Sequence, residues 1–586
     1  MNWFFGAFHE KSSDADYPIE SMLTEYFGEL RNYKKHVVAG DDFFFAEFTD
    51  DDQVSCFQND EVITFGTFRL KYLPDADCSQ PEYVSSLYKE HGEKFTDHLY
   101  GEFAFALCDR RKRQMILVRD HFGLEQIFWH AGDDKDLHVA NHLWLLKDYY
   151  SKTEISESFL EQFIKNNGLC CFRETPYKGV QRLNAAEFLV ADLQKNTVEP
   201  KTYWELTAVG KAKNVTYEEA AARLKELVTG SVREHAASKK KCGIMLSGGL
   251  DSTILYSAMD RKKTIAFSAV FDELESCDEK AYLNHTKEYF EDADVKYVKA
   301  DKAGFFEGYP DSFFYTSEPD VNCMNRRFSE IMFEQAQEND VKYVVDGFLA
   351  DHVFSGNVIY VLDEMKLSRL PQNYQRIREY AELRNVSVWE VIIHELLRAK
   401  KDPLFIPQID ESITKSNAEK LRRANAYGGK ELVVQITSAI ARNYGDREIA
   451  PRYSVEMLHP YVDRKIVEFL YGLPGEYLMK KGVPKALLKE AFHDAIPSEI
   501  RDRLCKTQHV ELSHQGIHDN WGNVWPTLSK GRITQIKTLN LSMEEWIRIL
   551  NEFRAGKTFN DVTLICIALE LWLNSIEVKY GKLSIN

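Results

Sequence analysis

The chain has 586 residues, more than one ordinary core accommodates, which predicts about two or three domains. Hydrophobic residues make up 44% and aromatic residues 13% of the chain, which excludes an intrinsically disordered protein. The net charge of −17 argues against nucleic acid as the main partner, because a phosphate backbone requires clustered Lys and Arg.

The N-terminal third is rich in short β-type runs separated by turn-like Asp, Gly and Lys clusters. These runs lie at residues 42–48, 62–65, 103–107, 115–118 and 126–129. Repeated strands joined by short turns predict an antiparallel β-sandwich. We place this domain at residues 1–210.

The pattern changes to alternating strands and helices near residue 215. Thr216 and Glu219 form a capping-box pair ahead of a helix. Strands are then predicted at residues 243–246, 264–270, 295–298 and 342–345, with helices from about residue 250 and near 279–290. This alternation predicts a parallel α/β sheet. From about residue 360 the pattern is mostly helical, so residues 211–586 are predicted to be an α/β domain with a large helical C-terminal part.

The ten cysteines are scattered and show neither a CxxC pair nor zinc-ligand spacing, which is typical of a reduced cytosolic protein. The first residues lack the features of a signal peptide. The apolar run at residues 563–573 is too short to span a bilayer and predicts a buried helix. We therefore expect a cytoplasmic protein without a membrane partner.

A glycine turn follows the strand at residues 243–246, in the string IMLSGGLDST. Gly248 and Gly249 permit a tight turn and let an anion approach the backbone N–H groups, and the following helix adds its positive end. Ser247 and Ser252 add hydroxyl donors. The carboxylate of Asp251 would repel a phosphate by itself, so we interpret Asp251 as a Mg²⁺ ligand. The turn lacks the Lys of a Walker loop, so its cations must come from elsewhere.

This string resembles the PP-loop of ATP pyrophosphatases, and the chain as a whole resembles the asparagine synthetase family. Seven further stretches carry that resemblance in the expected order: residues 99–109, 119–124, 278–279, 347–354, 459–463 and the late lysine segments at 485–489 and 505–508. The resemblance implies a glutaminase-like N-terminal domain of the Ntn type and an ATP-dependent synthetase domain.

The resemblance also assigns ATP and Mg²⁺ to particular residues. ATP would lie at residues 246–252, beginning with Leu246, and at Gly347. Asp351 would join Asp251 on Mg²⁺, with a helix cap as the alternative role for Asp351. Lys485 and Lys506 match the two lysines that approach the phosphates, and Lys506 would stabilise charge on the transition state and on departing pyrophosphate. A solvated surface position is the alternative for either lysine.

Two departures from the family pattern change the expected chemistry. Residue 2 is Asn where glutamine-dependent members have a nucleophilic Cys, so we expect a glutaminase fold without glutaminase chemistry. In the stretch at residues 347–354, which we call the second nucleotide loop, Phe348 replaces a Glu or Tyr and cannot act as a base. Leu349 replaces a glycine there, and His352 replaces a Glu. His352 is a candidate base or substrate contact, or satisfies local hydrogen bonds.

Relatives without the N-terminal Cys form amides within one molecule, and this chain most resembles lasso peptide cyclases. The resemblance predicts adenylation of a side-chain carboxylate of a precursor peptide, then attack by the peptide's own N-terminal amine. The implied partners are the precursor peptide, a leader peptidase and a leader-recognition protein. The alternatives are a small-molecule amide synthetase of the β-lactam synthetase type and a catalytically inactive scaffold.

Overall fold

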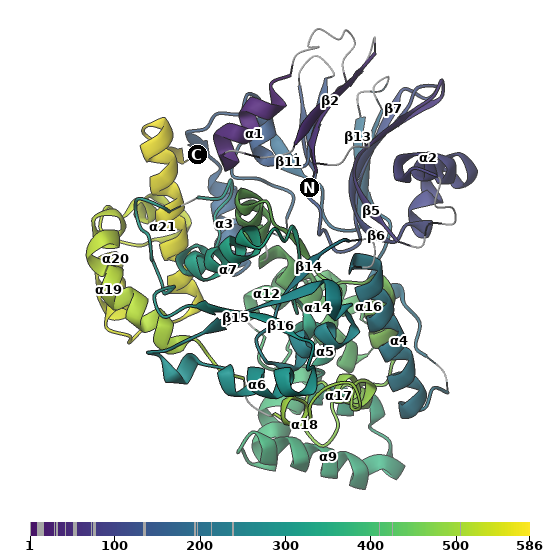
Figure 1. Cartoon of the computed structure of the whole chain (residues 1–586), viewed down its shortest axis with the longest axis vertical. Helices are drawn as coiled ribbons and strands as arrows, with labels where there is room; N and C mark the ends of the chain where they lie inside the picture. The colour runs from purple at the N-terminus through teal and green to yellow at the C-terminus, as the bar shows by residue number, and fades with distance from the viewer. Residues whose placement is uncertain are drawn as a thin grey trace.

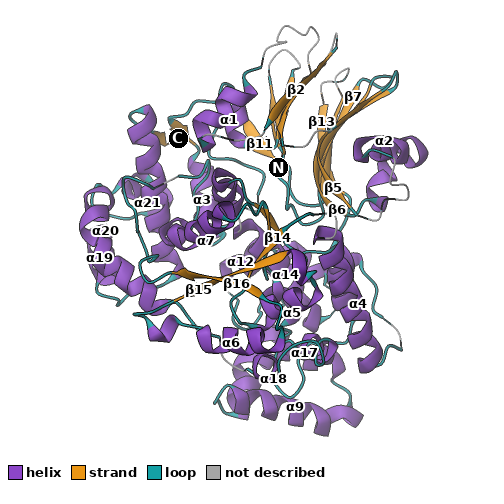
Figure 2. Cartoon of the chain, viewed as in Figure 1, coloured by secondary structure: helices purple, strands orange, loops and turns teal. Residues whose placement is uncertain are grey.

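The computed structural model describes residues 2–585 apart from 9–16, 29, 31–32, 41–42, 51–54, 72, 74–77, 133–135, 171, 193–194, 196, 213, 237–238, 314, 410, 425, 443 and 504–505. Its upper part in the figures is built from β-sheets and its lower part from a smaller sheet surrounded by helices (Figures 1 and 2).

The N-terminal half contains two six-stranded antiparallel sheets that face each other across a shared apolar core, as the sequence predicts. In spatial order the first sheet is β11 (Val180–Arg182), β8 (Phe128–Ala131), β9 (Leu137–Ala140), β1 (Asn2–Phe8), β3 (Phe43–Thr49) and β2 (Lys34–Ala39). The second is β13 (Thr197–Thr202), β12 (Glu187–Asp192), β7 (Gln114–Arg119), β6 (Gly101–Asp109), β5 (Val62–Leu70) and β4 (Cys56–Gln58).

Phenylalanine dominates the core between the two sheets. Phe4 and Phe45 come from the first sheet and Phe65 from the second, and all three side chains are buried. Alternating side chains of a strand point to opposite faces, so each sheet presents a second apolar face outward. Three helices cover these outer faces and edges: α1 (Ile19–Phe27), α2 (Gln80–His91) and α3 (Glu157–Lys165).

The second half is organised around a five-stranded parallel sheet. Its spatial order is β16 (Asp294–Lys299), β15 (Thr264–Val270), β14 (Cys242–Met245), β17 (Tyr343–Val345) and β18 (Glu456–Leu458). The first four are the strands that the sequence predicts. The fifth, β18, lies in the region predicted to be mostly helical, so that expectation was incomplete. The apolar composition of β14 and β15 fits strands covered on both faces.

Helices cover both faces of the parallel sheet and extend below it (Figure 1). Helix α4 (Tyr217–Ala236) precedes the first strand of this sheet. The helices that follow its strands are α5 (Leu250–Ala258), α6 (Lys280–Tyr289), α7 (Arg326–Glu338) and α8 (Ala350–Phe354). The later ones are α9 (Leu370–Leu383), α10 (Val388–Glu390), α11 (Arg398–Lys401), α12 (Glu411–Ser416), α13 (Ala418–Arg423), α14 (Tyr427–Arg442), α15 (Tyr444–Ile449), α16 (Arg464–Gly472), α17 (Ala486–Ala491), α18 (Ser498–Arg501), α19 (Val510–Leu528), α20 (Met543–Arg554) and α21 (Asp561–Tyr580).

The predicted capping box is present at the start of α4. The Glu219 backbone N–H donates to Thr216 Oγ1 at 3.2 Å, and the Thr216 backbone N–H donates to Glu219 Oε2 at 2.9 Å. Between the end of β13 and the start of α4 the chain passes from the antiparallel sheets to the parallel one. The domain limit at residue 210 within this interval stays a prediction.

The C-terminal helices return to the N-terminal half. Helix α21 is buried over most of its length, as predicted for residues 563–573, and Trp572 shares an apolar core with Trp3 and Phe159. The last strand, β19 (Ser584–Ile585), pairs in parallel with β10 (Glu154–Ile155). Among the described residues, no helix has the length and apolar character required to cross a bilayer.

Candidate nucleotide and adenylation site

The glycine turn lies at the carboxyl end of the central strand of the parallel sheet. β14 is flanked by β15 on one side and β17 on the other. After β14 the chain continues to β15 on one side, whereas β17 lies on the other side. The loops that follow β14 and β17 therefore lie side by side where the strand order reverses, and open α/β sheets bind ligands at such a position. The loops that follow these two strands, 246–249 and 346–349, form the two sides of the site.

The conformation of the first loop depends on its glycines. Gly248 has φ +72°, and a Cβ placed on it would lie 3.1 Å from the backbone nitrogen of Leu283 in α6. A Cβ on Gly249 would approach Ser247 Oγ to 3.2 Å. The hydroxyls of Ser247 and Ser252 lie 3.3 Å apart across the loop. The loop thus presents backbone N–H groups and two hydroxyls at the start of α5, as an anion requires.

Four charged side chains meet beside this loop. Lys485 Nζ lies 2.6 Å from Asp251 Oδ1 and 2.6 Å from Asp351 Oδ1. Lys506 Nζ lies 2.6 Å from Asp351 Oδ2 and 3.2 Å from Asp251 Oδ2. The two lysines therefore bridge the same two carboxylates. Four residues singled out from separate segments of the sequence form one cluster.

The cluster has a buried side and a solvent-facing side. The side chains of Lys485 and Asp251 are 7% and 11% exposed, whereas those of Lys506 and Asp351 are 55% and 54% exposed. Burial alone would raise the pKa of Asp351, but Lys485 and Lys506 outweigh it and lower that pKa to about 2. Burial likewise opposes the charge of Lys506, but Asp251 and Asp351 raise its pKa. The outer pair is therefore ionised at neutral pH, and it borders solvent through which a substrate can approach.

The donor set fits Mg²⁺ held jointly with a nucleotide. Asp251 and Asp351 supply carboxylate oxygens, the ligands that Mg²⁺ prefers. Among the described residues, no group of three or more His, Cys, Asp or Glu side chains is arranged to hold a metal. Two carboxylates leave most of an octahedral shell to phosphate oxygens and water, which is the usual arrangement for Mg²⁺ bound with a nucleotide.

The second loop is held tightly against the first. A Cβ on Gly347 would lie 3.2 Å from Asp251 Cβ, so a larger residue would displace the carboxylate. Leu349, where the family has glycine, keeps a left-handed conformation with φ +72°. A residue with a Cβ is strained there, and its buried side chain contributes to the core around Leu250. Strain of this kind is frequent at functional sites.

Phe348 and His352 occupy different surroundings. The Phe348 ring centroid lies 5.0 Å from that of His459, so this position carries an aromatic contact instead of a carboxylate or phenol. His352 follows Asp351 in α8 and is half-buried. Its role as a base or substrate contact stays a prediction.

Sequence reasoning missed an ion pair that fixes this loop. Asp346 and His459 directly follow the paired strands β17 and β18, and His459 Nδ1 lies 2.8 Å from Asp346 Oδ1. Asp346 Oδ1 also accepts the Phe348 backbone N–H at 3.1 Å. Burial opposes a charge on His459, but Asp346 raises its pKa. The pair anchors the loop that carries Asp351.

A second ion pair anchors the segment that carries Lys506. Arg503 Nη2 lies 2.8 Å from Glu279 Oε1, and Glu279 belongs to the stretch 278–279 that resembles the family. The Arg503 guanidinium also stacks on Tyr282, 3.8 Å from the ring centroid. Cys505, part of the same late segment, lies outside the described residues.

In the N-terminal half, the polar side chains around Asn2 differ from the charged cluster of the α/β half. Asn2 Nδ2, at the start of β1, donates to Ser55 Oγ at 2.9 Å and to Glu47. Cys56 lies next to this group in β4. Burial and the nearby Glu47 raise the pKa of Cys56 to about 12, so its thiol stays protonated and is a poor nucleophile.

A cavity of about 510 Å³ lies between the two halves, and its lining includes both Asn2 and His459. Arg69 crosses it, pairing with Glu102 at 3.2 Å, with Glu125 and with Glu456 at the start of β18. The N-terminal sandwich is thereby tied to the strand that leads into His459.

A glycine turn at the carboxyl end of a parallel strand, with two aspartates and two lysines at its mouth, forms a site suited to the phosphates of a nucleotide, and a β-sandwich lies behind it. The asparagine synthase family model matches residues 223–525, and a glutamine amidotransferase domain model matches residues 64–204. The chain belongs to the asparagine synthase family.

Characterised relatives match part of the chain. The Amidase chry2 of Gibberella zeae is 24% identical over 316 residues, 50% of this chain and 45% of that protein. Asparagine synthetase [glutamine-hydrolyzing] 2 of Bacillus subtilis is 25% identical over 291 residues, 46% of this chain and 37% of that protein. The chain thus spans less than half the length of these relatives.

Among solved structures, the glutamine PRPP amidotransferase from B. subtilis complexed with ADP and GMP matches at 10% identity. The match covers 63% of this chain and 79% of the amidotransferase chain. The TM-score of 0.23 is too low to support an argument about the fold.

Proposed function

We propose that the protein is an AMP-forming ligase that closes a ring in a peptide, as lasso peptide cyclases do. Family membership supports ATP-dependent amide bond formation. The observation that carries the finer proposal is the combination of an intact charged cluster at Asp251, Asp351, Lys485 and Lys506 with an amidotransferase-type domain whose Asn2 and Cys56 offer no activated thiolate.

In the proposed reaction, the glycine turn and α5 bind the triphosphate, and Asp251 and Asp351 would hold Mg²⁺. Bound there, the metal would supply charge neutralisation between carboxylates and phosphates. A side-chain carboxylate of the precursor peptide attacks the α-phosphorus, the bond to pyrophosphate breaks, and an acyl-adenylate forms. Lys485 and Lys506 lie where they can transfer their hydrogen bonds from the carboxylates to the phosphates and stabilise developing charge.

The second step is attack by the peptide's own N-terminal amine on the activated carbonyl. The carbon–nitrogen bond forms and AMP departs with the bonding electron pair. The proton released by the amine passes to a base, for which His352 is the candidate. Holding both ends of one molecule together removes much of the entropic cost of this step. Glutamine is not needed in this scheme. We also propose a cytoplasmic location, with a leader peptidase and a leader-recognition protein as partners.

The alternative is a small-molecule amide synthetase of the β-lactam synthetase type. It shares the adenylation chemistry and differs in the substrate. Short peptides carrying a free N-terminal amine and an Asp or Glu side chain can be compared with small β-amino acids, with AMP, ADP and pyrophosphate quantified. AMP formation with peptides alone, without glutamine, is the expected result. ADP formation, or a requirement for glutamine, would contradict the proposal.

A further inference from the structure

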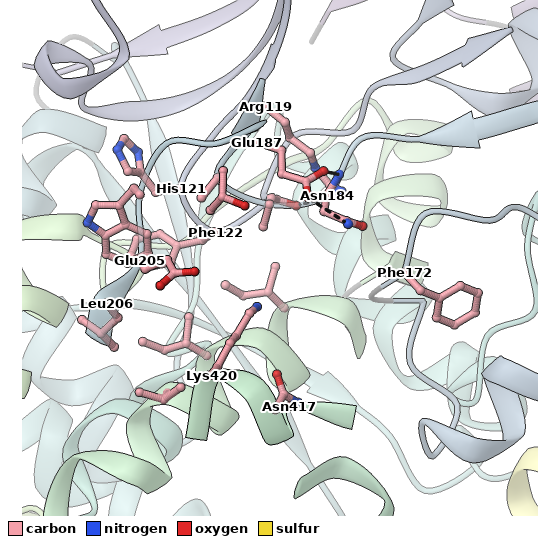
Figure 3. A pocket seen from close by; sticks show the side chains of 18 of the residues that line it. Arg119, His121, Phe122, Phe172, Asn184, Glu187, Glu205, Leu206, Asn417 and Lys420 are labelled. Atoms are coloured by element: carbon pink, nitrogen blue, oxygen red, sulfur yellow. Dashed lines mark hydrogen bonds between the residues drawn. The ribbon is translucent and has the colours of Figure 1, made fainter. Parts of the chain in front are cut away.

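A second cavity lies away from the glycine turn. Its volume is about 820 Å³, and it separates the N-terminal domain from helices α12, α13 and α14. Figure 3 shows Arg119, Asn184 and Glu187 entering it from the N-terminal domain, and Lys420 and Asn417 from the opposite, helical side. Ligand pockets range over about 300–1,000 Å³, so this cavity has room for much more than a single amino acid.

One wall of the cavity is apolar. It is formed by Phe122, Leu206, Val433, Ile436 and Ile440. The last three lie on α14, which also packs against α8, the helix that carries Asp351. The same apolar core includes Leu250 and Leu349 of the two nucleotide loops. The cavity wall and the adenylation site are therefore parts of one packed unit.

Two side chains that line the cavity carry a carbonyl oxygen without a hydrogen-bond donor in the described part of the chain. Asn184 Nδ2 donates to Glu187 Oε1 at 3.2 Å, which directs its carbonyl oxygen elsewhere. Within the described residues, no protein group donates to Asn184 Oδ1 or to Gln126 Oε1, although both atoms are buried. Buried carbonyl oxygens require N–H or O–H donors, and a peptide backbone presents N–H groups at regular intervals.

The charges that line the cavity favour an anion. Glu187 and Glu205 are paired with Arg173 and Arg423 respectively, so their charge is already balanced. Lys165, Lys415 and Lys420 line the cavity from three different helices and are exposed. Among the described residues, Lys165 pairs with Glu161 and Lys415 with Glu411, each one helical turn away, and exposed pairs of this kind are weak. The lysines remain able to attract a carboxylate.

We propose that this cavity binds an extended, carboxylate-bearing segment of the peptide substrate. The apolar wall would hold its side chains and the lysines would attract its carboxylate. The carbonyl oxygens of Asn184 and Gln126 are covered in the structure, and these side chains would turn toward the cavity to accept backbone N–H groups. The inference rests on the proposed function, because it takes the substrate to be a peptide. Binding here would leave another part of the same peptide to reach the adenylation site beyond α14.

The test measures binding of short fluorescein-labelled peptides of randomised sequence to the full chain by fluorescence anisotropy. One pool carries free C-terminal carboxylates, and a matched pool carries C-terminal carboxamides. Ile436→Trp fills the apolar wall, and Lys420→Glu reverses one charge. Lys262→Glu is the matched control, since Lys262 is an exposed lysine at the amino end of β15. Affinity for ATP·Mg²⁺ reports whether each variant is correctly folded.

We expect the carboxylate pool to bind more tightly than the carboxamide pool. Lys420→Glu should weaken its binding about fivefold, and Ile436→Trp should weaken it at least about tenfold. Lys262→Glu and the affinity for ATP·Mg²⁺ should not change. Equal binding of both pools, or unchanged binding to Ile436→Trp, would overturn the inference.

Peptide-dependent AMP formation separates this inference from the proposed function. If the wild-type protein forms AMP with peptides and Ile436→Trp does so with unchanged KM, the cavity is not the peptide site and the ligase proposal stands. If peptides bind in the cavity as expected and no AMP forms with any pool, the site stands and the proposed reaction fails.

Discussion

The two halves of this molecule both have a well-packed core but differ in the polar groups that they bring together. In the sandwich, Asn2 is tied by hydrogen bonds to Glu47 and Ser55, and the adjacent Cys56 is held as a thiol. In the α/β half, four charged residues from separate segments still converge on one point. Apolar cores and strand ladders maintain a fold, whereas a few polar groups carry the reaction. In the proposed reaction the sandwich contributes contacts such as the Arg69–Glu456 pair and no reacting group.

The largest effect is expected from the charged cluster. Asp251→Asn keeps the shape of the side chain but leaves Lys485, which is 7% exposed, without one of its two carboxylates. It also removes a proposed Mg²⁺ ligand. AMP formation should fall by about a thousandfold or more, equivalent to about 4 kcal/mol of transition-state stabilisation. A variant that folds normally by circular dichroism and retains more than about a tenth of the activity would remove Asp251 from the mechanism.

The free energy of unfolding should depend on pH through Glu448, which lies at the contact between the two halves. Glu448 of α15 accepts hydrogen bonds from Tyr26 of α1 and from the Ser317 backbone N–H at 2.7 Å. Burial raises the pKa of Glu448 to about 7. The folded carboxyl therefore stays protonated while the unfolded one ionises near pH 4.5. Stability should be fully present below that pH, fall by about 3 kcal/mol up to about pH 7, and then level off.

Glu448→Gln should remove this part of the pH dependence, because an amide does not ionise in this range. Denaturant unfolding between pH 4.5 and 8 measures it. Glu544→Gln, at an exposed position in the first turn of α20, is the matched control and should retain the wild-type slope. Parallel slopes for wild type and Glu448→Gln would show that Glu448 ionises normally in the folded protein.

The second nucleotide loop permits a smaller test of stored strain. Leu349 is 2% exposed and has φ +72°. Leu349→Gly loses a buried side chain but relieves the left-handed conformation, so it should destabilise the fold by about 2 kcal/mol. Leu349→Ala loses a similar contact and keeps the strain. It should be less stable than the glycine variant by about 1 kcal/mol in denaturant unfolding. The reverse order would mean that the loop relaxes when the side chain is shortened.

The parts of the fold and site that could be predicted are those whose sequence pattern lies within one short stretch of the chain. The strand at residues 264–270 is observed with the predicted bounds, because β-branched and apolar residues and flanking turns mark it within one window. The glycine turn is equally local. Asp351, Lys485 and Lys506 could be linked to it only through resemblance to a family, since no periodicity connects segments so far apart.

The features that were missed depend on long-range pairing. Strand β18 has three residues, too few for a periodic pattern, and it exists because it pairs with β17. The contact between Asp346 and His459 follows from the register that places Val345 opposite Leu458. The bridge from Arg69 to Glu456 likewise requires the two halves to be packed together. Neither composition nor spacing contains that information.

The smallest effect is expected at Asn2, in the first strand of the sandwich. Asn2→Ala removes the donor to Ser55 Oγ and to Glu47, a buried carboxylate, and should cost about 1 kcal/mol of stability. Asn2→Asp places a second carboxylate beside Glu47 and should cost more. Because no reacting group is assigned to Asn2, AMP formation by the folded alanine variant should stay within about twofold of wild type. A loss of about tenfold or more at unchanged stability would show that the N-terminal half still takes part in the reaction, and the contrast between the two halves would no longer hold.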